Sequence, residues 1–325
     1  MSTAVSGGTG FVGSNIVRML AERGHRVVSL DIAPPNEMVL KYLAPWKNRI
    51  DFVEVDILDT DALDRAARSS EMAGVEKIVH AAVYTSTLSE TERDDSKRII
   101  DVNVGCTINL LEMARRISAK RFLYVSSGGV YRGQGGAGKA LTEDLPLLPE
   151  SFYGVTKFAS EGITKRYGEL HDLETVSVRL SSPYGPMERA TDYRLKMGML
   201  YDWTRSVVRA EPIYVPSEVG GGDWMFVTDK AEAIATVLDA PTLEHSMYNI
   251  TQGSPTSLEG LMDAFRQAEP SVEFRGPGAE GMSVPWDQGH MDVSRLHALG
   301  FRPKYNIVSG VAEYIRWRRE FPFLD

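Results

Sequence analysis

A tyrosine and a lysine four residues apart are the first candidates for chemistry in this chain. Tyr153 and Lys157 open a predicted helix over 153–171, and residues at this spacing share one helix face. Tyrosine is a weak base at its ordinary pKa of about 10, but a nearby ammonium group favours the phenolate. The pair could therefore act as a general base, although the same spacing also occurs on helix faces that only meet solvent.

Two serines strengthen the chemical interpretation. Ser126 and Ser127 close an apolar run, 121–126, that is predicted as the strand preceding this helix. A serine hydroxyl at that strand end could hold a substrate hydroxyl beside the phenol of Tyr153. The serine, the tyrosine and the lysine in this order rarely arise by chance, so together they predict a site that moves a proton to or from an alcohol.

A glycine-rich turn near the start of the chain supplies a second candidate site. Gly7, Gly10 and Gly13 lie between a β-prone run, 3–5, and a predicted helix, 15–23. Glycine is favoured where a side chain would block a close approach, and a turn leading into a helix N-terminus offers backbone N–H groups to a pyrophosphate. The glycines alone would also fit a surface turn, but their place between strand and helix predicts dinucleotide binding.

Asp31 indicates which dinucleotide to expect. It ends the next apolar run, 27–30, and a carboxylate at this place accepts hydrogen bonds from both ribose hydroxyls and repels a 2′-phosphate. No Arg or Lys occurs in 32–36 to offset that repulsion. The sequence therefore favours NAD over NADP.

Composition narrows the class of protein. The 325 residues are 43% hydrophobic and 25% charged, with a formal net charge of −8. This is ordinary for a globular enzyme and leaves no broad basic field for nucleic acid or an anionic membrane. The single cysteine, Cys106, lies in an apolar helical run, where burial is a commoner role than nucleophilic catalysis. No signal-like or membrane-spanning segment is apparent and no metal site is predicted, so we expect a cytoplasmic enzyme acting on a small molecule.

Strands and helices alternate through the first half of the chain, which predicts an α/β fold with a doubly wound parallel sheet. The predicted strands are 3–5, 27–30, 52–56, 77–82, 121–126 and 175–179, and the helices between them include 60–73, 96–117 and 153–171. After Arg179 proline and glycine break this rhythm, and two helical patterns follow late, at 257–268 and 307–319. We expect a Rossmann domain over 1–179 with a return segment near 223–240, and a smaller substrate-binding lobe formed by 180–222 and 241–325.

Together these features resemble the extended short-chain dehydrogenase/reductase family, the group of NAD-dependent nucleotide-sugar epimerases and dehydratases. The resemblance covers nearly the whole chain. Besides the glycine turn and Asp31 it includes Asp56-Ile57, His80-Ala81-Ala82, Asn103, 126–131, 153–157, Tyr184-Gly185-Pro186, Tyr248-Asn249-Ile250 and 299–303. It implies a Rossmann fold, NAD as cofactor, and a homodimer formed through the helices at 96–117 and 153–171.

The resemblance also implies roles for single residues. Ser127 would be the catalytic serine and Tyr153 the general acid/base, while Lys157 would bind the nicotinamide ribose and tune the tyrosine. The other residues implied at the cofactor are Gly7, Gly10, Phe11, Val12, Gly13, Asp31, Asp56, Ile57, Ala81, Ala82 and Asn103. For Asn103, a helix side chain that bonds the backbone is an equally good interpretation.

Departures from the family pattern bear on the substrate. Where nucleotide-sugar enzymes have an asparagine that contacts the nucleotide-sugar, this chain has Ser182, and where they commonly have an arginine that meets the diphosphate, it has Gly222, before Asp223-Trp224. Where the dehydratases tend to have an acidic pair after the catalytic serine or threonine, it has Gly128-Gly129. These departures weaken the expectation of a diphosphate-sugar substrate.

Two arginines follow Pro186, where the substrate loop of the family should begin. Arg189 and Arg194 could clamp a carboxylate or phosphate through paired hydrogen bonds. They could equally be solvated surface residues paired with Glu188 and Asp192, so a carboxylate-bearing substrate is one of two interpretations. The candidate substrate contacts are Ser127, Ser182, Arg189 and Arg194.

The favoured function is an NAD-dependent dehydrogenase that oxidises a secondary alcohol of a small sugar, sugar acid or related hydroxy acid. Tyr153 would remove the hydroxyl proton and Ser127 would orient the oxygen. The alternative is a nucleotide-sugar epimerase of the UDP-sugar 4-epimerase type, which uses the same groups and keeps NAD bound. A nucleotide sensor is least favoured, because it would not need the three catalytic side chains.

Overall fold

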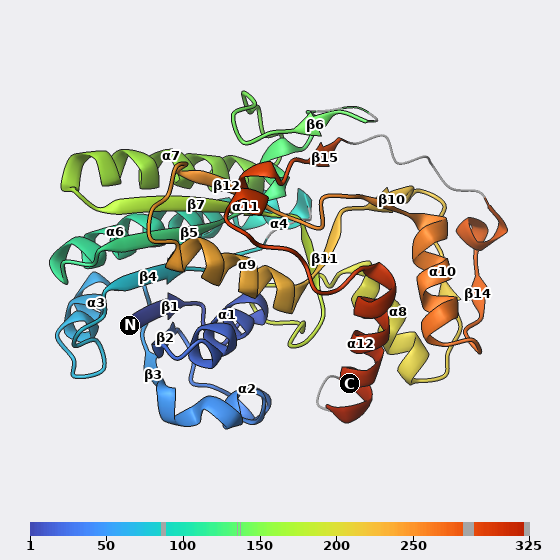
Figure 1. Ribbon diagram of the computed structural model, residues 1–325, viewed down its shortest axis with the longest axis horizontal. Coiled ribbons are helices and arrows are strands. Elements are labelled where there is room, and N and C mark those ends of the chain that lie inside the picture. The colour runs from blue at the N-terminus through green and yellow to red at the C-terminus, as the bar shows by residue number, and fades with distance from the viewer. Residues whose placement is uncertain (86–88, 135, 137, 282–288, 322–325) are drawn as a thin grey trace.

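Seven parallel strands form the central sheet of the protein, shown as a computed structural model in Figure 1. The structure describes residues 1–85, 89–134, 136, 138–281 and 289–321. In spatial order the strands are β12 (Met247–Ile250), β7 (Glu174–Leu180), β5 (Arg121–Ser127), β4 (Lys77–His80), β1 (Ser2–Ser6), β2 (Arg26–Asp31) and β3 (Ile50–Glu54). The chain order reverses between β1 and β4, and open α/β sheets bind ligands at such a point, outside the carboxyl ends of the strands. The predicted fold class is confirmed.

Helices cover both faces of this sheet (Figure 1). One face carries α3 (Thr60–Ala67), α6 (Cys106–Arg116) and α7 (Phe152–His171), which bury a cluster that includes Ile78, Leu110 and Phe122. On the other face α1 (Phe11–Glu22) packs on α9 (Val227–Asp239), and Ile16 and Ile234 are fully buried there. Each helix presents an apolar stripe to the sheet, which is what anchors it.

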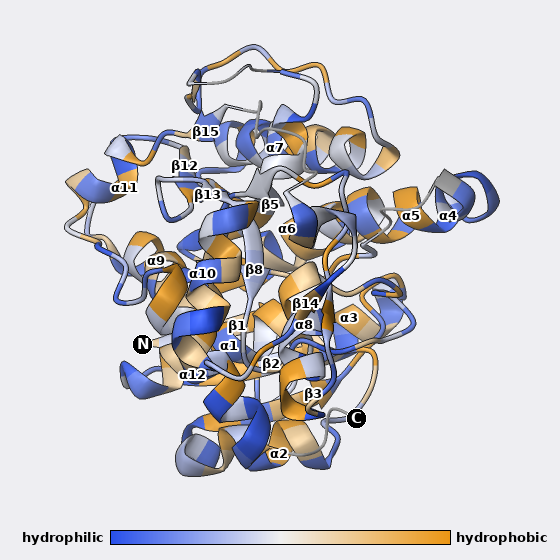
Figure 2. Cartoon of the chain, turned by 90° about the vertical axis from the view of Figure 1, so that its right-hand side faces the viewer, coloured by the Kyte–Doolittle hydropathy of each residue, from blue (hydrophilic) through white to orange (hydrophobic). Residues whose placement is uncertain are grey.

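The remaining elements lie at the rim of the sheet and in a smaller lobe. The helices are α2 (Glu37–Leu43), α4 (Ser89–Asp94), α5 (Ser96–Ile100), α8 (Met199–Val208), α10 (Leu258–Ala268), α11 (Ser294–Ala298) and α12 (Ile307–Glu320). The short strands are β6 (Ala140–Leu141), β8 (Ser182–Tyr184), β9 (Ile213–Tyr214), β10 (Gly221–Gly222), β11 (Trp224–Phe226), β13 (Thr256–Ser257), β14 (Phe274–Arg275) and β15 (His290–Met291). In the smaller lobe α8, α10 and α12 pack together, and Figure 2 shows that hydrophobic and hydrophilic residues alternate along them.

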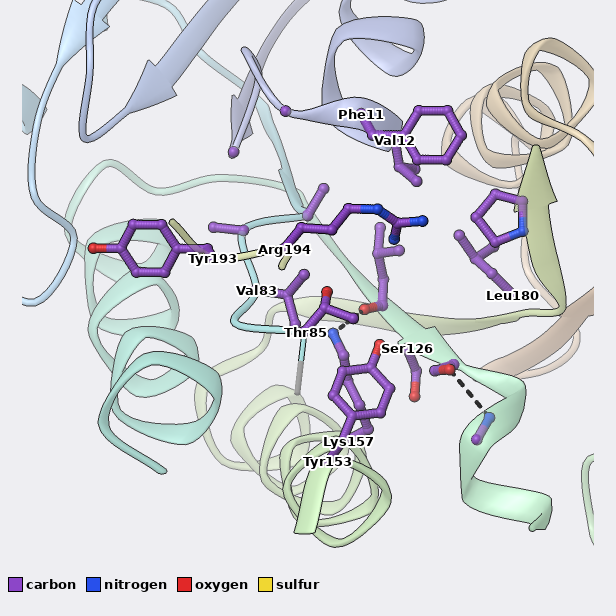
Figure 3. Close-up of a pocket in the computed structure, with 18 of the residues that line it drawn as sticks. Phe11, Val12, Val83, Thr85, Ser126, Tyr153, Lys157, Leu180, Tyr193 and Arg194 are labelled. Carbon is purple, nitrogen blue, oxygen red and sulfur yellow. Dashed lines mark hydrogen bonds between the residues drawn. The ribbon is translucent and has the colours of Figure 1, made fainter. Parts of the chain in front are cut away.

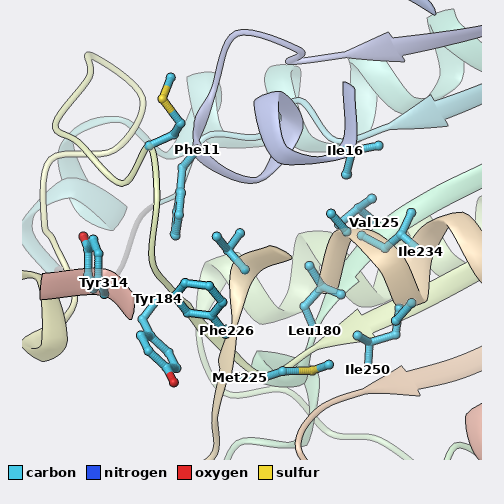
Figure 4. Close-up of a cluster of buried hydrophobic side chains, with 14 of the residues drawn as sticks. Phe11, Ile16, Val125, Leu180, Tyr184, Met225, Phe226, Ile234, Ile250 and Tyr314 are labelled. Atoms are coloured by element: carbon cyan, nitrogen blue, oxygen red, sulfur yellow. The ribbon is translucent and has the colours of Figure 1, made fainter. Parts of the chain in front are cut away.

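Buried aromatic rings join the smaller lobe to the sheet. Phe11 of α1, Tyr184 of β8, Phe226 of β11 and Tyr314 of α12 belong to one apolar cluster (Figure 4). The ring centroid of Tyr184 lies 5.4 Å from that of Phe226 and 6.4 Å from that of Tyr314. Because aromatic pairs at this range pack with defined geometry, this seam fixes the lobe against the sheet and so sets the shape of the cleft between them.

Three elements differ from the sequence expectations. The edge strand β12 comes from 241–325, the range assigned to the smaller lobe, yet it pairs with β7 in the central sheet, because Tyr248 and Ile250 bury their side chains there. The helix expected over 60–73 ends at Ala67, before two serines that favour turns. The helix expected over 96–117 is interrupted, because a π-helical turn, Asp101–Gly105, separates α5 from α6.

Candidate active site

One large cavity opens at the carboxyl ends of the strands. Its volume is about 1540 Å³, well above the roughly 300–1,000 Å³ of a typical small-ligand pocket, so it has room for a dinucleotide and a small substrate together. The glycine turn and Asp31 line this cavity, and so do Ser127, Tyr153 and Lys157. Figure 3 shows Tyr153 and Lys157 next to each other in it. The two candidate sites that the sequence suggested are therefore parts of one cavity.

The glycine turn has no room for side chains. A Cβ atom on Gly13 would lie 1.9 Å from the carbonyl oxygen of Gly7, and one on Gly7 would lie 2.7 Å from the Cα of Ala82. Gly7 also has a φ of 68°, in the region that favours glycine. This close packing leaves the first N–H groups of α1 facing the cavity, since no described side chain caps the helix at Gly10. Such an N-terminus suits a pyrophosphate.

Asp31 is held in position at the end of β2. The backbone N–H and the hydroxyl of Thr9 donate to its Oδ2 at 2.9 and 2.7 Å, and the N–H of Ile32 donates to its Oδ1 at 2.9 Å. These bonds fix the carboxylate at the cavity wall, where it can still accept from a ribose hydroxyl. Other residues expected at the cofactor that also line the cavity are Gly10, Phe11, Val12, Asp56, Ile57, Ala81 and Ala82.

The three catalytic candidates come together as expected. Ser127 ends β5, and its Oγ accepts a hydrogen bond from the N–H of Gly129 at 3.1 Å. Tyr153 lies in the first turn of α7, where the Ser151 side chain caps the helix by accepting from the N–H of Gly154. Ser127 and Tyr153 both line the cavity, and Figure 3 shows Tyr153 beside Lys157.

Lys157 is almost fully buried, at 3% exposed. Its Nζ donates to the carbonyl oxygen of Val125 at 2.7 Å and lies 4.8 Å from the ring centroid of Tyr124 and 5.9 Å from that of Tyr153. Burial lowers the pKa of this lysine to about 7, against the opposing effect of the Glu161 carboxylate. Desolvation raises the pKa of Tyr153, while a hydrogen bond with Ser127 and the charge of Arg194 act to lower it. The phenolate therefore depends on these neighbours for its stability.

A buried ion pair lies near the three catalytic candidates. Glu161, one turn after Lys157 on α7, accepts two hydrogen bonds from Arg179 of β7, at 2.9 and 2.8 Å, and one from the hydroxyl of Ser126 at 2.6 Å. The side chains of Glu161 and Arg179 are 4% and 5% exposed. This pair ties α7 to β5 and β7 at the level where Ser127 and Tyr153 must meet. Sequence reasoning missed it, because its members carry no motif of their own.

The side chain of Asn103 is taken up by hydrogen bonds within the fold. It lies in the π-helical turn, where its side chain accepts from the N–H of Tyr84 at 2.8 Å and donates to the carbonyl of Tyr84 and to Thr156. It does not appear among the described residues that line the cavity. This geometry favours the interpretation of Asn103 as a side chain that bonds the backbone.

Cys106 is also structural in its surroundings. It is 1% exposed, and burial together with two nearby carboxylates raises the pKa of its thiol to about 12. A thiol with so high a pKa is a poor nucleophile. Its packing agrees with the role expected from the sequence.

Arg189 and Arg194 lie along the cavity wall rather than free in solvent. Arg189 donates to the carbonyl oxygens of Thr9 and Met187, at 2.5 and 3.3 Å. Arg194 forms an ion pair with the fully buried Glu188 at 2.7 Å. The pairing of Arg194 with Glu188 was one of the alternatives open from the sequence, but this pair is largely enclosed, with 21% of the arginine side chain exposed.

The far end of the cavity is assembled from distant segments. Ser182 and Gly222 line it, as do Met291 and Gly289 from the C-terminal part of the chain. The indole of Trp224 folds over Gly222, so that a Cβ atom there would lie 2.5 Å from Cζ2 of the ring. This chain therefore has a tryptophan ring where a side chain at position 222 would begin, a feature that only the structure could show.

The described residues contain neither a group of metal ligands nor a membrane-spanning helix. The part of the chain that the structure describes holds no group of three or more His, Cys, Asp or Glu residues that could bind a metal ion. Within the same residues, no helix has the length and apolar character needed to cross a bilayer.

Comparisons with known proteins identify a matching family model and several relatives. The model of the NAD dependent epimerase/dehydratase family matches residues 3–251. The chain is 28% identical to a UDP-glucose 4-epimerase of Mycolicibacterium smegmatis, over 98% of this chain and 99% of that protein. It is 29% identical to a dTDP-glucose 4,6-dehydratase of Xanthomonas campestris, over 96% and 92%.

A solved structure shares the whole fold. The UDP-glucose 4-epimerase of Thermus thermophilus in complex with NAD superposes with a TM-score of 0.80 at 25% identity, over 99% of each chain. The chain belongs to the NAD-dependent epimerase/dehydratase family and is an NAD-dependent enzyme of the short-chain dehydrogenase/reductase type.

Proposed function

We propose that this enzyme oxidises a secondary alcohol of a small sugar, sugar acid or hydroxy acid. The observation that carries the proposal is the Trp224 ring packed over Gly222, because this position is where nucleotide-sugar enzymes commonly present an arginine to the diphosphate. Ser182, in place of an asparagine that contacts the nucleotide-sugar, points the same way. A substrate without a diphosphate does not need either contact.

The cavity wall fits NAD, whose binding supplies a hydride acceptor for the alcohol carbon. We propose that the glycine turn and the N-terminus of α1 hold the diphosphate and that Asp31 binds the adenosine ribose. The residues we propose to contact the cofactor are Gly7, Gly10, Phe11, Val12, Gly13, Asp31, Asp56, Ile57, Ala81, Ala82, Tyr153 and Lys157.

Proton transfer falls to the three central side chains. Ser127 donates a hydrogen bond to the substrate oxygen and fixes its orientation, while the Tyr153 phenolate accepts the hydroxyl proton. The Lys157 ammonium stabilises that phenolate and binds the nicotinamide ribose. The alcohol loses one proton to Tyr153 and one hydride to the cofactor, which leaves a carbonyl.

A nucleotide-sugar epimerase is the second candidate, favoured by the relatives. The Mycolicibacterium and Thermus proteins are both named UDP-glucose 4-epimerases, and an epimerase would use the same three residues. The reactions differ in outcome, since an epimerase returns the hydride to its substrate and accumulates no NADH.

NADH formation tests the proposal. The enzyme is mixed with excess NAD and, in turn, with free aldoses, sugar acids, hydroxy acids and UDP-sugars, and NADH is followed by its absorbance. We expect steady NADH accumulation with a free sugar or acid. Epimerised UDP-sugar without net NADH would support the second candidate and overturn the first.

We also propose a homodimer in the cytoplasm, where NAD is available. Ile108 of α6 and Phe158 of α7 are each 42% exposed, and Ile100 of α5 and Val155 of α7 are exposed as well. Large apolar side chains gathered on exposed helices are typical of an interface between copies. Sedimentation should show a dimer that Phe158→Glu converts to a monomer, and a monomeric wild type would contradict the assignment.

A further inference from the structure

The segment Met187 to Arg194, which we call the arginine strap, runs across the cofactor side of the cavity. At one end the Asn15 side chain donates to the carbonyl of Pro186 at 3.0 Å, and Arg189 donates to the carbonyl of Thr9 in the glycine turn. At the other end the N–H of Thr85 donates to the carbonyl of Tyr193 at 2.9 Å. The strap thus connects the turn after β1 to the segment after β4, the two sides of the expected dinucleotide site.

Aromatic and cationic side chains reinforce the second anchor. The ring of Tyr193 packs edge-on against Tyr84, with centroids 5.7 Å apart, and the guanidinium of Arg98 lies 4.8 Å from the Tyr193 ring centroid. These contacts hold Arg194, the next residue, in a fixed position on the cavity wall.

Arg194 is directed at the N-terminus of α1. Its guanidinium carbon lies 5.3 Å from the ring centroid of Phe11, the first residue of that helix, and Figure 3 shows it extending from the Val83 and Thr85 side toward Phe11 and Val12. Its Nε is buried without a hydrogen-bond partner among the described residues. Glu188 holds the guanidinium from behind and is itself held by the N–H of Gly198 at 3.0 Å.

Arg189 adds positive charge at the neighbouring place. Its two hydrogen-bond acceptors are carbonyl oxygens, which do not neutralise a guanidinium as a carboxylate would. Burial lowers the pKa of Arg189, and the negative charge of Asp31 acts to raise it. Arg189 therefore contacts the glycine turn and Arg194 lies beside the first residue of α1, so two guanidinium groups reach this region from a distant part of the chain.

We propose that the arginine strap is a clasp for the cofactor: Arg194 binds the diphosphate of NAD opposite the N-terminus of α1, and Arg189 locks the strap to the glycine turn. Guanidinium groups and helix N-terminal N–H groups are both strong ligands for phosphate oxygens. The clasp would slow the release of the dinucleotide. This role concerns the cofactor and is independent of which substrate the enzyme takes.

Binding of adenine nucleotides tests the clasp without any substrate. Affinities of the cofactor-free protein for adenosine, ADP and NAD are measured by calorimetry in the wild type and in Arg194→Met. We expect the variant to lose about tenfold or more in affinity for ADP and NAD, the effect of one charge-assisted contact, and to bind adenosine as the wild type does. Arg205→Met on α8, which removes an exposed arginine paired with Asp202, is the matched control.

The rate of cofactor release tests the proposed role of Arg189. The dissociation rate of NADH, followed by fluorescence during a chase with excess NAD, should rise several-fold in Arg189→Met. Arg194→Met leaves the buried carboxylate of Glu188 without its arginine. If this variant unfolds, the double variant Glu188→Gln with Arg194→Met, which also removes that charge, replaces it in the measurements.

Two results would overturn the proposal. One is wild-type affinity for ADP in a folded variant that lacks Arg194. The other is an equal loss for adenosine and ADP, which would mean that the adenosine pocket had been deformed. A loss of affinity for acidic substrates alone, with ADP binding intact, would assign Arg194 to the substrate instead.

Discussion

The two ends of the cavity are built in different ways. The cofactor end comes mostly from one continuous stretch, β1, the glycine turn, α1 and β2, which ends at Asp31. The substrate end combines the ends of β5 and β7 with Ser182, Gly222 and Met291, which are far apart in the chain. Local geometry constrains the first end tightly, because backbone must approach backbone in the turn. The second end can vary its side chains without disturbing the sheet.

The largest effect is expected at Tyr153, where the two ends of the cavity meet. Tyr153→Phe removes only the phenolic oxygen, so turnover should fall by about 10²- to 10⁴-fold, the usual contribution of general acid–base catalysis. The dissociation constant for NAD should change far less than turnover, because the ring of Tyr153 stays in place. Steady-state kinetics and calorimetry provide the two measurements. Tyr167→Phe, on the same helix, is the control, and near-normal turnover in Tyr153→Phe would break the assignment.

The buried ion pair of Glu161 and Arg179 should contribute to the stability of the fold. Glu161→Gln or Arg179→Met leaves one charged partner buried and should cost about 3–5 kcal/mol in free energy of unfolding. Replacing both, as in Glu161→Leu with Arg179→Met, should cost less than the sum of the single changes, because no charge remains unpaired. Urea denaturation measures this, and strictly additive losses would show that the pair does not act as a unit.

Asp31 tests the cofactor end. Asp31→Ala should weaken NAD binding by about tenfold and reduce discrimination against NADP, since it removes both the ribose contact and the repulsion of the 2′-phosphate. In the structure, the charges of Arg189 and Asp31 attract each other. The gain in NADP binding should therefore shrink when Arg189→Met is added to Asp31→Ala. A wild-type preference for NADP would refute this view of the strand end.

A smaller effect concerns the pH dependence of stability. Burial lowers the pKa of Lys157 to about 7 in the folded protein, below its unfolded value of about 10.4, so between these values the unfolded state binds more protons. Stability of the cofactor-free protein should therefore rise with pH, by about 1 kcal/mol from pH 7 to 8 for this lysine.

Lys157→Met should remove that share of the rise. Lys230, whose pKa burial also lowers to about 7, contributes a rise of its own, so the difference between the wild type and Lys157→Met isolates Lys157. Denaturation at several pH values measures it. Identical pH slopes in the two proteins would show that burial does not lower the pKa of this lysine.

The sequence was informative where function is encoded locally. The order of strands and helices, the glycine turn, Asp31 and the spacing of Tyr153 and Lys157 follow from propensity and periodicity, and the family resemblance agreed with them. The sequence could not show contacts between distant segments. The approach of Arg189 to Thr9, the pairing of Glu161 with Arg179 and the entry of β12 into the central sheet depend on tertiary packing. The Trp224 ring over Gly222 is of the same kind, since the two residues form no motif.

The substrate end provides the most direct test of the proposed function. The measurement is the ratio of kcat/KM values for NADH formation from a free sugar acid and from the same sugar acid linked to UDP, in the wild type at saturating NAD. Because Trp224 lies over Gly222 and no arginine stands at that position to bind a diphosphate, we expect the UDP group to bring no gain, so that the free acid is used at least as efficiently as the UDP-linked compound. A clear preference for the UDP-linked compound would contradict the proposal and return the enzyme to the nucleotide sugars of its relatives.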